Sequence, residues 1–265
     1  MLTGAIMKKF VLAAIAAVAV ATPLAADDLL PTGTLRATYI ASNMAQAFVD
    51  PQTNEVRGPA AELARELAKK LGVPFTIKGV TGVPGVLASV KAGEADIGFV
   101  AYDPVRASEV DFSQTYALAQ NTYLVLDGSA IKSAADVDKA GVRVGVATND
   151  AGDLFLTRNL KNAELKRNPG GNLDTAVKML QAGEIDVYAA NRTRLSELIK
   201  RTPGLRLTPE NFYGVEQSVS VQKGNAKLLA VVEAFLDEAR SSGLIQGAID
   251  RAGVPGVDVA PKKAR

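Results

Sequence analysis

The sequence predicts an α/β protein built from two lobes of similar architecture. One phrase occurs twice: residues 91–99 read Lys-Ala-Gly-Glu-Ala-Asp-Ile-Gly-Phe, and residues 181–189 read Gln-Ala-Gly-Glu-Ile-Asp-Val-Tyr-Ala. Each copy has the pattern of a helix end, a glycine stop and a short buried strand. A further strand that leads into a helix precedes each copy, at residues 35–40 and 142–146. A cleft between two such lobes suits the enclosure of a small molecule.

Apolar residues recur at helical spacing over residues 59–71, and Gly72 is placed to end that helix. The same reasoning predicts the remaining elements of the first half, which are strands at 35–40, 74–77 and 95–101 and a helix at 83–92. The second half repeats the plan, with strands at 141–147, 185–189 and 214–222 and helices at 152–160, 173–182, 192–201, 226–240 and 244–252.

Residues 116–126 join the two halves and form an apolar, strand-like run, whereas a flexible tether would be rich in Gly, Ser or Pro. We interpret this run as a stiff hinge, with a second crossing near residues 208–213 that returns the chain to the first lobe. The expected organisation is then lobe 1 from residues 27–119 and 213–265, and lobe 2 from residues 120–212.

The first 26 residues have the pattern of a secretory signal peptide. Lys8 and Lys9 form a basic start, and residues 10–20 form an apolar run. Residues 22–26 are mostly small, as in the region before a cleavage site. An uncleaved membrane anchor is the alternative, but the apolar run is short for a bilayer span. Because the chain has no cysteine to take a lipid, we expect a freely diffusing exported protein.

Histidine is absent as well as cysteine. This removes the usual zinc ligands, the Ser–His and Cys–His nucleophile pairs and the commonest general base. The composition therefore disfavours an enzyme, and we expect no metal or cofactor.

The formal net charge of +2 becomes zero once Lys8 and Lys9 are removed with the signal peptide. A balanced surface gives no reason to expect nucleic acid or an anionic membrane as partner, and we expect a monomer.

The most specific short motif is Asp103-Pro104-Val105-Arg106-Ala107. Asp followed by Pro favours a helix start, because Asp caps free N–H groups and the φ of Pro is already set. Arg106 in that first turn opposes the positive end of the helix dipole, so it needs an anion nearby. Either Arg106 and the free N–H groups bind a ligand carboxylate, or Arg106 pairs with a neighbouring acid. The candidate acids are Asp103, Glu109 and Asp111.

The corresponding point of the second lobe is residues 147–153, where a strand passes into a helix, and ligands tend to bind at such points. Asn149 and Asp150 can cap that helix or offer side chains to a ligand, and capping alone is the simpler interpretation of Asp150. Phe99 and Tyr102 flank the Arg106 turn. Each of these aromatic residues either walls a pocket or belongs to the core.

Residues 58–72, 92–96 and 103–113 read Gly-Pro-Ala-Ala-Glu-Leu-Ala-Arg-Glu-Leu-Ala-Lys-Lys-Leu-Gly, Ala-Gly-Glu-Ala-Asp and Asp-Pro-Val-Arg-Ala-Ser-Glu-Val-Asp-Phe-Ser. Together with residues 141–146 and 228–236, their order and spacing closely resemble the family 3 extracellular solute-binding proteins. These are periplasmic receptors of polar amino-acid ABC importers. The resemblance covers nearly the whole mature chain. It implies a type II periplasmic-binding-protein fold, in which each lobe is a mixed sheet flanked by helices and two hinge strands let the lobes close on a ligand. It also implies a periplasmic location, a small carboxylate-bearing ligand such as an amino acid, and the membrane permease of an ABC transporter as partner.

Arg106 matches the family arginine that binds the ligand α-carboxylate. Asn149–Ala151 match the second-lobe turn that completes this grip, although many members have Ser or Thr there. Asn43 lies in the first-lobe loop that usually touches the ligand side chain. Asn191 falls where amino-acid receptors have the aspartate that pairs with the ligand ammonium.

Two departures from the family bear on the ligand. The stretch from residue 96 to residue 106 is shorter than in typical members, which alters the pocket wall at Phe99–Ala101. Asn191 supplies a neutral amide in place of a carboxylate, so either Asp150 or Asp103 compensates or the ligand is another small carboxylate. Two alternative functions remain: an enzyme on the same scaffold, similar to dehydratases of cyclic carboxylates, and a ligand-sensing subunit that docks on a membrane receptor.

Overall fold

The computed structural model describes residues 29–148 and 150–262, so the predicted signal peptide and Asn149 lie outside the described residues. The strands are β1 Leu35–Ile40, β2 Phe48–Val49, β3 Val56–Arg57, β4 Phe75–Val80, β5 Ile97–Ala101, β6 Val110–Leu126, β7 Arg143–Ala147, β8 Glu164–Asn168, β9 Val187–Asn191, β10 Leu205–Leu207, β11 Tyr213–Gln222 and β12 Val257–Val259. The α-helices are α2 Pro59–Leu71, α3 Gly82–Lys91, α4 Ala151–Asn159, α5 Leu173–Gln181, α6 Arg192–Arg201, α7 Ala226–Ser241 and α8 Leu244–Ala252. Within the described ranges, no helix combines the length and apolar character needed to cross a membrane.

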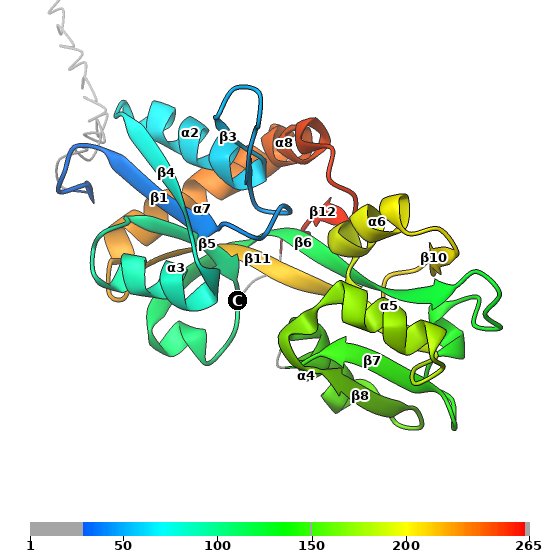
Figure 1. The fold of residues 1–265 in the computed structure, drawn as a ribbon. Coiled ribbons are helices and arrows are strands. Elements are labelled where there is room, and N and C mark those ends of the chain that lie inside the picture. Colours follow the sequence, from blue (N-terminus) through cyan, green and yellow to red (C-terminus); the bar gives the residue numbers. More distant parts are fainter. Residues whose placement is uncertain (1–28, 149, 263–265) are drawn as a thin grey trace, which may run out of the picture.

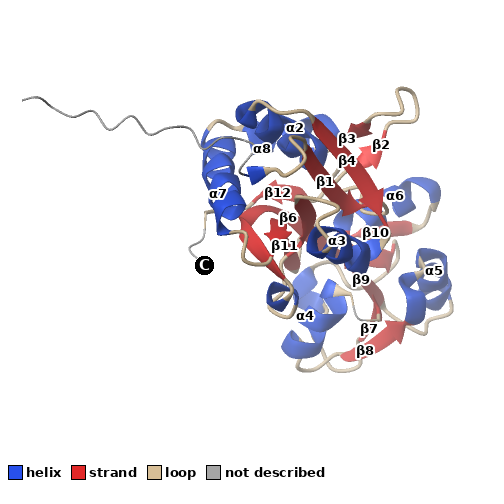
Figure 2. Cartoon of the chain, turned by 90° about the vertical axis from the view of Figure 1, so that its left-hand side faces the viewer, coloured by secondary structure: helices blue, strands red, loops and turns tan. Residues whose placement is uncertain are grey.

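The predicted two-lobed α/β fold is confirmed, and the two lobes share one mixed sheet. The strand order is β4-β1-β5-β11-β6-β9-β7-β8, and β10 and β12 also pair with β6. Strands β4, β1 and β5 are parallel in the first lobe, and β9, β7 and β8 are parallel in the second. Figure 1 shows β6 and β11 running between the two lobes, and in Figure 2 the pair β1 and β4 lies above the pair β7 and β8.

Strand β6 is longer than the sequence indicates. It extends over 17 residues, Val110–Leu126, and its antiparallel partners are β11, β9, β10 and β12. The predicted run at 116–126 is thus only the second part of this strand. The chain returns to the first lobe through β11, which pairs with β6 and then with β5.

Helix α2 shows how the sequence sets an element boundary. Gly58 precedes it with φ of 114°, and Pro59 occupies the first turn. Gly72 ends it in the left-handed conformation, where its N–H donates to the carbonyls of Ala68 and Lys69. A residue with a Cβ is disfavoured at both glycine positions, so these two glycines and the proline fix the helix ends that the sequence predicts.

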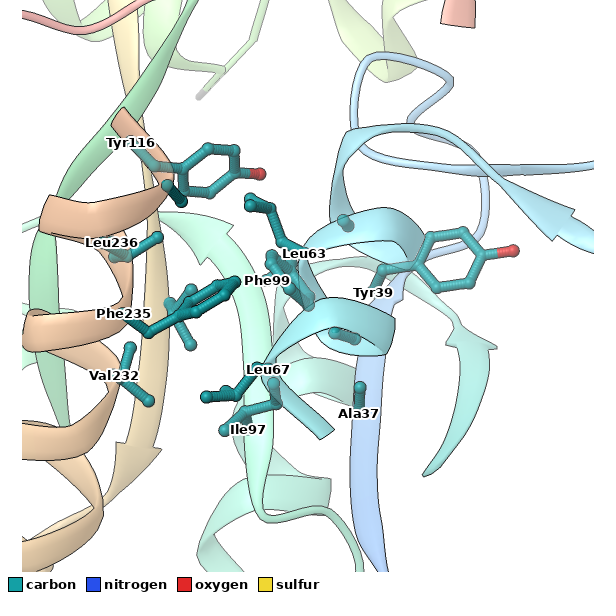
Figure 3. Close-up of a cluster of buried hydrophobic side chains, with 14 of the residues drawn as sticks. Ala37, Tyr39, Leu63, Leu67, Ile97, Phe99, Tyr116, Val232, Phe235 and Leu236 are labelled. Atoms are coloured by element: carbon teal, nitrogen blue, oxygen red, sulfur yellow. The ribbon is translucent and has the colours of Figure 1, made fainter. Parts of the chain in front are cut away.

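Helices cover both faces of the sheet in the first lobe. Figure 3 shows Phe99 of β5 between side chains of α2, such as Leu63 and Leu67, and side chains of α7, such as Phe235. Successive residues of a strand face opposite sides of the sheet, so position 98 faces the side opposite to Phe99. A Cβ at Gly98 would lie 2.7 Å from Val86 Cγ1 in α3. The glycine therefore lets α3 pack closely on β5.

The second lobe has the same layering. Helices α5 and α6 pack with Tyr188 and Leu124 on one face of the sheet. On the other face, Leu156 of α4 packs with Val144 and Val187. Each lobe thus has its own apolar clusters, one on each face of the sheet.

Candidate functional site

A cavity of about 690 Å³ lies where the two lobes meet the connecting strands. Its volume falls in the range typical of small-molecule sites. Both lobes and both connecting strands contribute to its wall. The polar residues that line it are Ser42, Asn43, Gln46, Tyr102, Asp103, Arg106, Asn121, Asp150, Arg158, Asn191, Thr193, Arg194, Glu197, Tyr213 and Gln217.

The floor of the cavity is formed by three neighbouring strands. Tyr213 of β11 is the register partner of Asn121 in β6, and Asn121 is the partner of Asn191 in β9. All three residues line the cavity. Register partners project from the same face of a sheet, so these side chains form a row across the sheet.

Arg106 lies on the cavity wall in a short 3₁₀ turn, Arg106–Ser108, that follows β5. Its Nη1 donates to the carbonyl oxygen of Ala101 at 2.9 Å. The predicted helix start at Asp103 is present in reduced form, since Asp103 Oδ1 accepts the N–H groups of Val105 and Arg106 at 2.8 and 3.3 Å. The guanidinium is thereby held beside the cavity at the end of a buried strand.

Two of the three candidate acids near Arg106 form ion pairs with other residues. Glu109 pairs with Lys91 at 2.6 Å, and Asp111 pairs with Lys223 at 2.7 Å. Within the described part of the chain, no carboxylate forms an ion pair with Arg106. The alternative of a surface ion pair is therefore not what the structure shows.

The start of helix α4 forms the second-lobe wall. Asp150, Ala151 and Gly152 line the cavity, and Asp150 caps the helix by accepting the N–H of Asp153 at 2.7 Å. Burial raises the pKa of Asp150 above the usual carboxyl value. Capping and a place on the cavity wall thus coexist in one side chain. The other predicted residue of this turn, Asn149, lies outside the described residues.

Asn191 ends β9 and also lines the cavity. Its Oδ1 accepts the N–H of Arg194 at 3.3 Å, so it caps helix α6. The amide oxygen is partly engaged by the backbone. The side chain places no formal charge on this part of the wall.

Of the remaining predicted residues, Asn43, Ala101 and Tyr102 line the cavity and Phe99 does not. Phe99 is 1% exposed, and its ring packs edge-on against Tyr116 with centroids 6.0 Å apart. It belongs to the first-lobe core, because it projects from β5 toward α2 and α7. Tyr102 instead packs edge-on against Phe112 at 5.4 Å, at the cavity rim.

Sequence reasoning missed several wall residues. Gln46 and Gln217 are buried and joined by a hydrogen bond of 3.0 Å from Gln46 Nε2 to Gln217 Oε1. Arg158 and Arg194 bring two further cations to the wall. Gln217 interrupts the apolar residues at alternate positions of its strand, Tyr213, Val215, Val219 and Val221, and this is a detectable anomaly. Nothing in the local sequence marks Arg158, which lies on the exposed side of a helix.

An aromatic stack supports the wall near Tyr213. The ring of Tyr213 stacks on Phe155 of α4 at 4.4 Å, and Phe212 stacks on Tyr123 at the same centroid distance. Phe155 also contacts Phe212 at 5.9 Å. Burial raises the pKa of Tyr213. The stack connects the second-lobe helix that carries Asp150 to both connecting strands.

Two lobes joined by antiparallel strands around a cavity with polar and charged wall residues define a solute-binding fold. The model of the bacterial extracellular solute-binding proteins, family 3, matches residues 35–252, and the chain belongs to that family. The resemblance seen in the sequence is thus confirmed.

Individual relatives are similar over most of their length. A probable histidine-binding protein of Neisseria gonorrhoeae is 26% identical over 250 residues, which cover 89% of this chain and 92% of the relative. A glutamine-binding protein of Geobacillus stearothermophilus is 29% identical over 177 residues, 63% of this chain and 65% of the relative. A solved ancestral arginine-binding protein bound to glutamine is 26% identical with a TM-score of 0.61, covering 83% of this chain and 97% of that one.

Proposed function

We propose that the protein captures a small carboxylate-bearing solute, an amino acid or a related compound, and delivers it to the membrane permease of an ABC importer. Membership of the solute-binding family supports capture without chemical change. Histidine and glutamine, named for two relatives, both carry an α-carboxylate. The observation that carries the proposal is the position of Arg106 on the cavity wall, with Glu109 and Asp111 paired to lysines.

Arg106 has the chemistry to hold a carboxylate. A guanidinium presents a planar fork of donors that matches two carboxylate oxygens, and such charge-assisted bonds are stronger than neutral ones. The bond from Nη1 to Ala101 fixes the group and leaves further donors for a ligand. Pre-positioning lowers the conformational entropy that binding would otherwise cost.

The opposite wall provides a second anchor. The turn at Asp150 opens helix α4, and Ala151 and Gly152 of its first turn line the cavity. Helix starts favour negative charge. We therefore assign the ligand carboxylate to Arg106 in one lobe and to this turn in the other, where Asn149 would also contribute. Asn43 and Tyr102 would contact the rest of the ligand.

The ammonium of an amino-acid ligand has no aspartate at position 191. Asp150 and Asp103 line the cavity and belong to the two turns that carry the proposed carboxylate anchors. In each of them one carboxylate oxygen caps a turn. Asp150 accepts the N–H of Asp153, and Asp103 accepts the N–H of Val105. We propose that Asp150 is the acid that faces an ammonium, because it lies at the second-lobe anchor.

Capture by closure requires two rigid lobes and a hinge. We assign residues 27–119 and 213–265 to lobe 1 and residues 120–212 to lobe 2. Strands β6 and β11 would bend where they cross between the lobes. Closure would then bring the Asp150 turn toward Arg106. Residues 1–26 would direct export to the periplasm, where the mature protein would act as a monomer.

An enzymatic role on the same scaffold is the competing proposal. It needs an acid or base poised near neutrality that touches the substrate, and the sequence contains no histidine. Incubating the purified protein with the ligand and analysing the solution by mass spectrometry tests this point. Recovery of unchanged ligand is expected, and formation of a product would favour the enzyme.

Native mass spectrometry of the protein as purified tests the ligand class. We expect a co-purified solute of low mass that carries a carboxylate and is released on denaturation. A tightly bound solute without any carboxylate would contradict the proposal. Arg106→Ala protein, purified in parallel, should lose the bound solute.

A further inference from the structure

Asn121 lies on the floor of the cavity, yet within residues 29–148 and 150–262 its amide nitrogen Nδ2 is buried without a hydrogen-bond partner. The residue is 4% exposed. Buried polar groups almost always have a partner, which is a protein group, a water molecule or a ligand. An unsatisfied buried donor is unfavourable. A donor of this kind on the wall of a binding cavity therefore calls for an acceptor that arrives with the occupant.

The neighbours of Asn121 cannot serve as that acceptor in the observed arrangement. Asn191 lies beside it in β9 and uses Oδ1 to accept the N–H of Arg194. Tyr213 lies on the other side in β11, with its ring stacked on Phe155. Gln46 and Gln217, the other amides on the cavity wall, are bonded to each other. The row across the sheet at this level is therefore rich in amides and carries no carboxylate.

We infer that the Asn121 amide determines ligand specificity by donating a hydrogen bond to an oxygen acceptor of the ligand. Its terminal torsion is soft, so the amide can turn Nδ2 toward a bound group without a change in the backbone. The inference rests on the proposed function and narrows its ligand class. The solute carries one carboxylate for Arg106 and a second oxygen acceptor for Asn121, which is a carbonyl, a carboxamide or another carboxylate.

Ligands that end in a cation do not meet this requirement. An ammonium or guanidinium offers donors only, so it leaves Nδ2 unsatisfied. A site built to hydrogen-bond one group discriminates strongly against analogues that lack it. The structure therefore predicts a preference for acceptor-ended over cation-ended amino acids.

Calorimetry with four compounds tests the inference. L-glutamine and L-glutamate end in acceptors, whereas L-lysine and L-arginine end in donors. We expect wild-type protein to bind the tighter acceptor-ended compound at least about tenfold more tightly than either cation-ended one. Asn121→Leu should remove this preference by weakening only the acceptor-ended compounds. Gln120→Leu is the matched control, because Gln120 is next in the same strand, bonds to Asp258 and does not line the cavity.

Thermal unfolding separates a binding role from a structural one. Asn121→Leu removes an unsatisfied donor, so the ligand-free variant should be no less stable than wild type. If leucine prevents folding, Asn121→Asp keeps the shape and replaces the donors with acceptors, and it should shift the preference toward L-lysine and L-arginine.

Three outcomes would overturn the inference. They are equal affinity of the wild type for all four compounds, unchanged affinities in both Asn121 variants, and an equal loss for all four compounds. In each case, solute binding by the Arg106→Ala variant still tests the proposed function independently. Binding of none of the four compounds by the wild type would also overturn the inference, whereas the proposed function is then judged by native mass spectrometry of the purified protein.

Discussion

The carboxylate of Asp96 accepts three hydrogen bonds from Arg36, and the carboxylate of Asp186 accepts the same three from Arg143 in the other lobe. In the first pair, the backbone N–H and Nε of Arg36 donate to Asp96 Oδ2 at 2.8 and 3.1 Å, and Nη2 donates to Oδ1 at 2.6 Å. The corresponding distances in the second pair are 2.8, 3.0 and 2.8 Å. Each aspartate directly precedes a central strand, β5 or β9. The repeated Gly-Glu-x-Asp motif thus marks the same arginine–aspartate contact in both lobes, and we call this contact the joint of each lobe.

The two joints differ in burial, which predicts a difference in stability. The Asp96 side chain is 6% exposed and that of Asp186 is 33% exposed. Asp96→Asn leaves a less hydrated arginine without its charge partner and should lower the free energy of unfolding by about 2–4 kcal/mol, against about 1–2 kcal/mol for Asp186→Asn. Urea unfolding measures both. Glu66→Gln, which removes an exposed pair with Lys69, is the control and should cost at most about 0.5 kcal/mol. Equal losses at the two joints would contradict this account.

The Arg143–Asp186 joint also predicts that the stability of the protein decreases in acid. Hydrogen bonds from Arg143 hold the pKa of Asp186 below its usual value. A carboxyl whose pKa is lower in the folded than in the unfolded state contributes stability above the unfolded pKa, about 3.9. That contribution is lost as pH falls through the folded pKa. The stability difference between wild type and Asp186→Asn should therefore be constant near pH 7 and shrink below about pH 4. A difference that grows on acidification would show the wrong sign.

Much of the fold follows from the sequence because its helices and central strands have regular apolar patterns. The helix over residues 59–71 and the strand over residues 35–40 are observed with the predicted bounds. The strands that pattern analysis missed are polar or very short. Strand β8, with the sequence Glu-Leu-Lys-Arg-Asn, lies at the sheet edge and has little apolar surface to reveal it.

The site was predicted less completely than the fold. Arg106 was predicted because its helix-start motif is local, and Asp150 because it follows a strand, and both line the cavity. Asn121 and Gln217 were not found, since they lie in strands whose register brings them to the cavity only after distant segments pair. Phe99 was placed among the candidates because it is close to Arg106 in sequence, but strand alternation points it into the core.

The close contact between α3 and β5 predicts intolerance of a methyl group at Gly98. A Cβ there would lie 2.7 Å from Val86 Cγ1 and 2.8 Å from both Ser220 Oγ and Val90 Cγ2. Gly98→Ala should lower the free energy of unfolding by about 1–3 kcal/mol through overpacking. Gly128→Ala has open space around the added carbon and serves as the control. Equal urea midpoints for the two variants would contradict the packing described for this helix.

The burial of Asp150 predicts a cost in stability near neutral pH. Burial raises its pKa, so between the unfolded and folded pKa values the native state binds more protons, and stability falls as pH rises through that window. Asn is an equally good helix cap. Asp150→Asn should therefore be more stable than wild type at pH 7, and this gain should disappear as the pH is lowered below about 4. Asp150→Ala loses the cap and should be about 1 kcal/mol less stable than the asparagine variant. Identical unfolding curves for wild type and Asp150→Asn at pH 7 would show that the carboxylate is not strained by burial.

The central claim is that Arg106 binds the carboxylate of the solute. Isothermal titration calorimetry on the tightest binder among L-glutamine, L-glutamate, L-lysine and L-arginine tests it most directly. Arg106→Ala should weaken binding at least about tenfold, consistent with the loss of roughly 2–5 kcal/mol seen when one partner of a charged pair is removed. The affinity of Arg106→Lys should lie between those of wild type and Arg106→Ala, because lysine keeps the charge and loses the planar fork of donors. Arg57→Ala, which removes an exposed arginine paired with Asp50 and away from the cavity, should bind like wild type. An unchanged affinity in folded Arg106→Ala protein would contradict the claim.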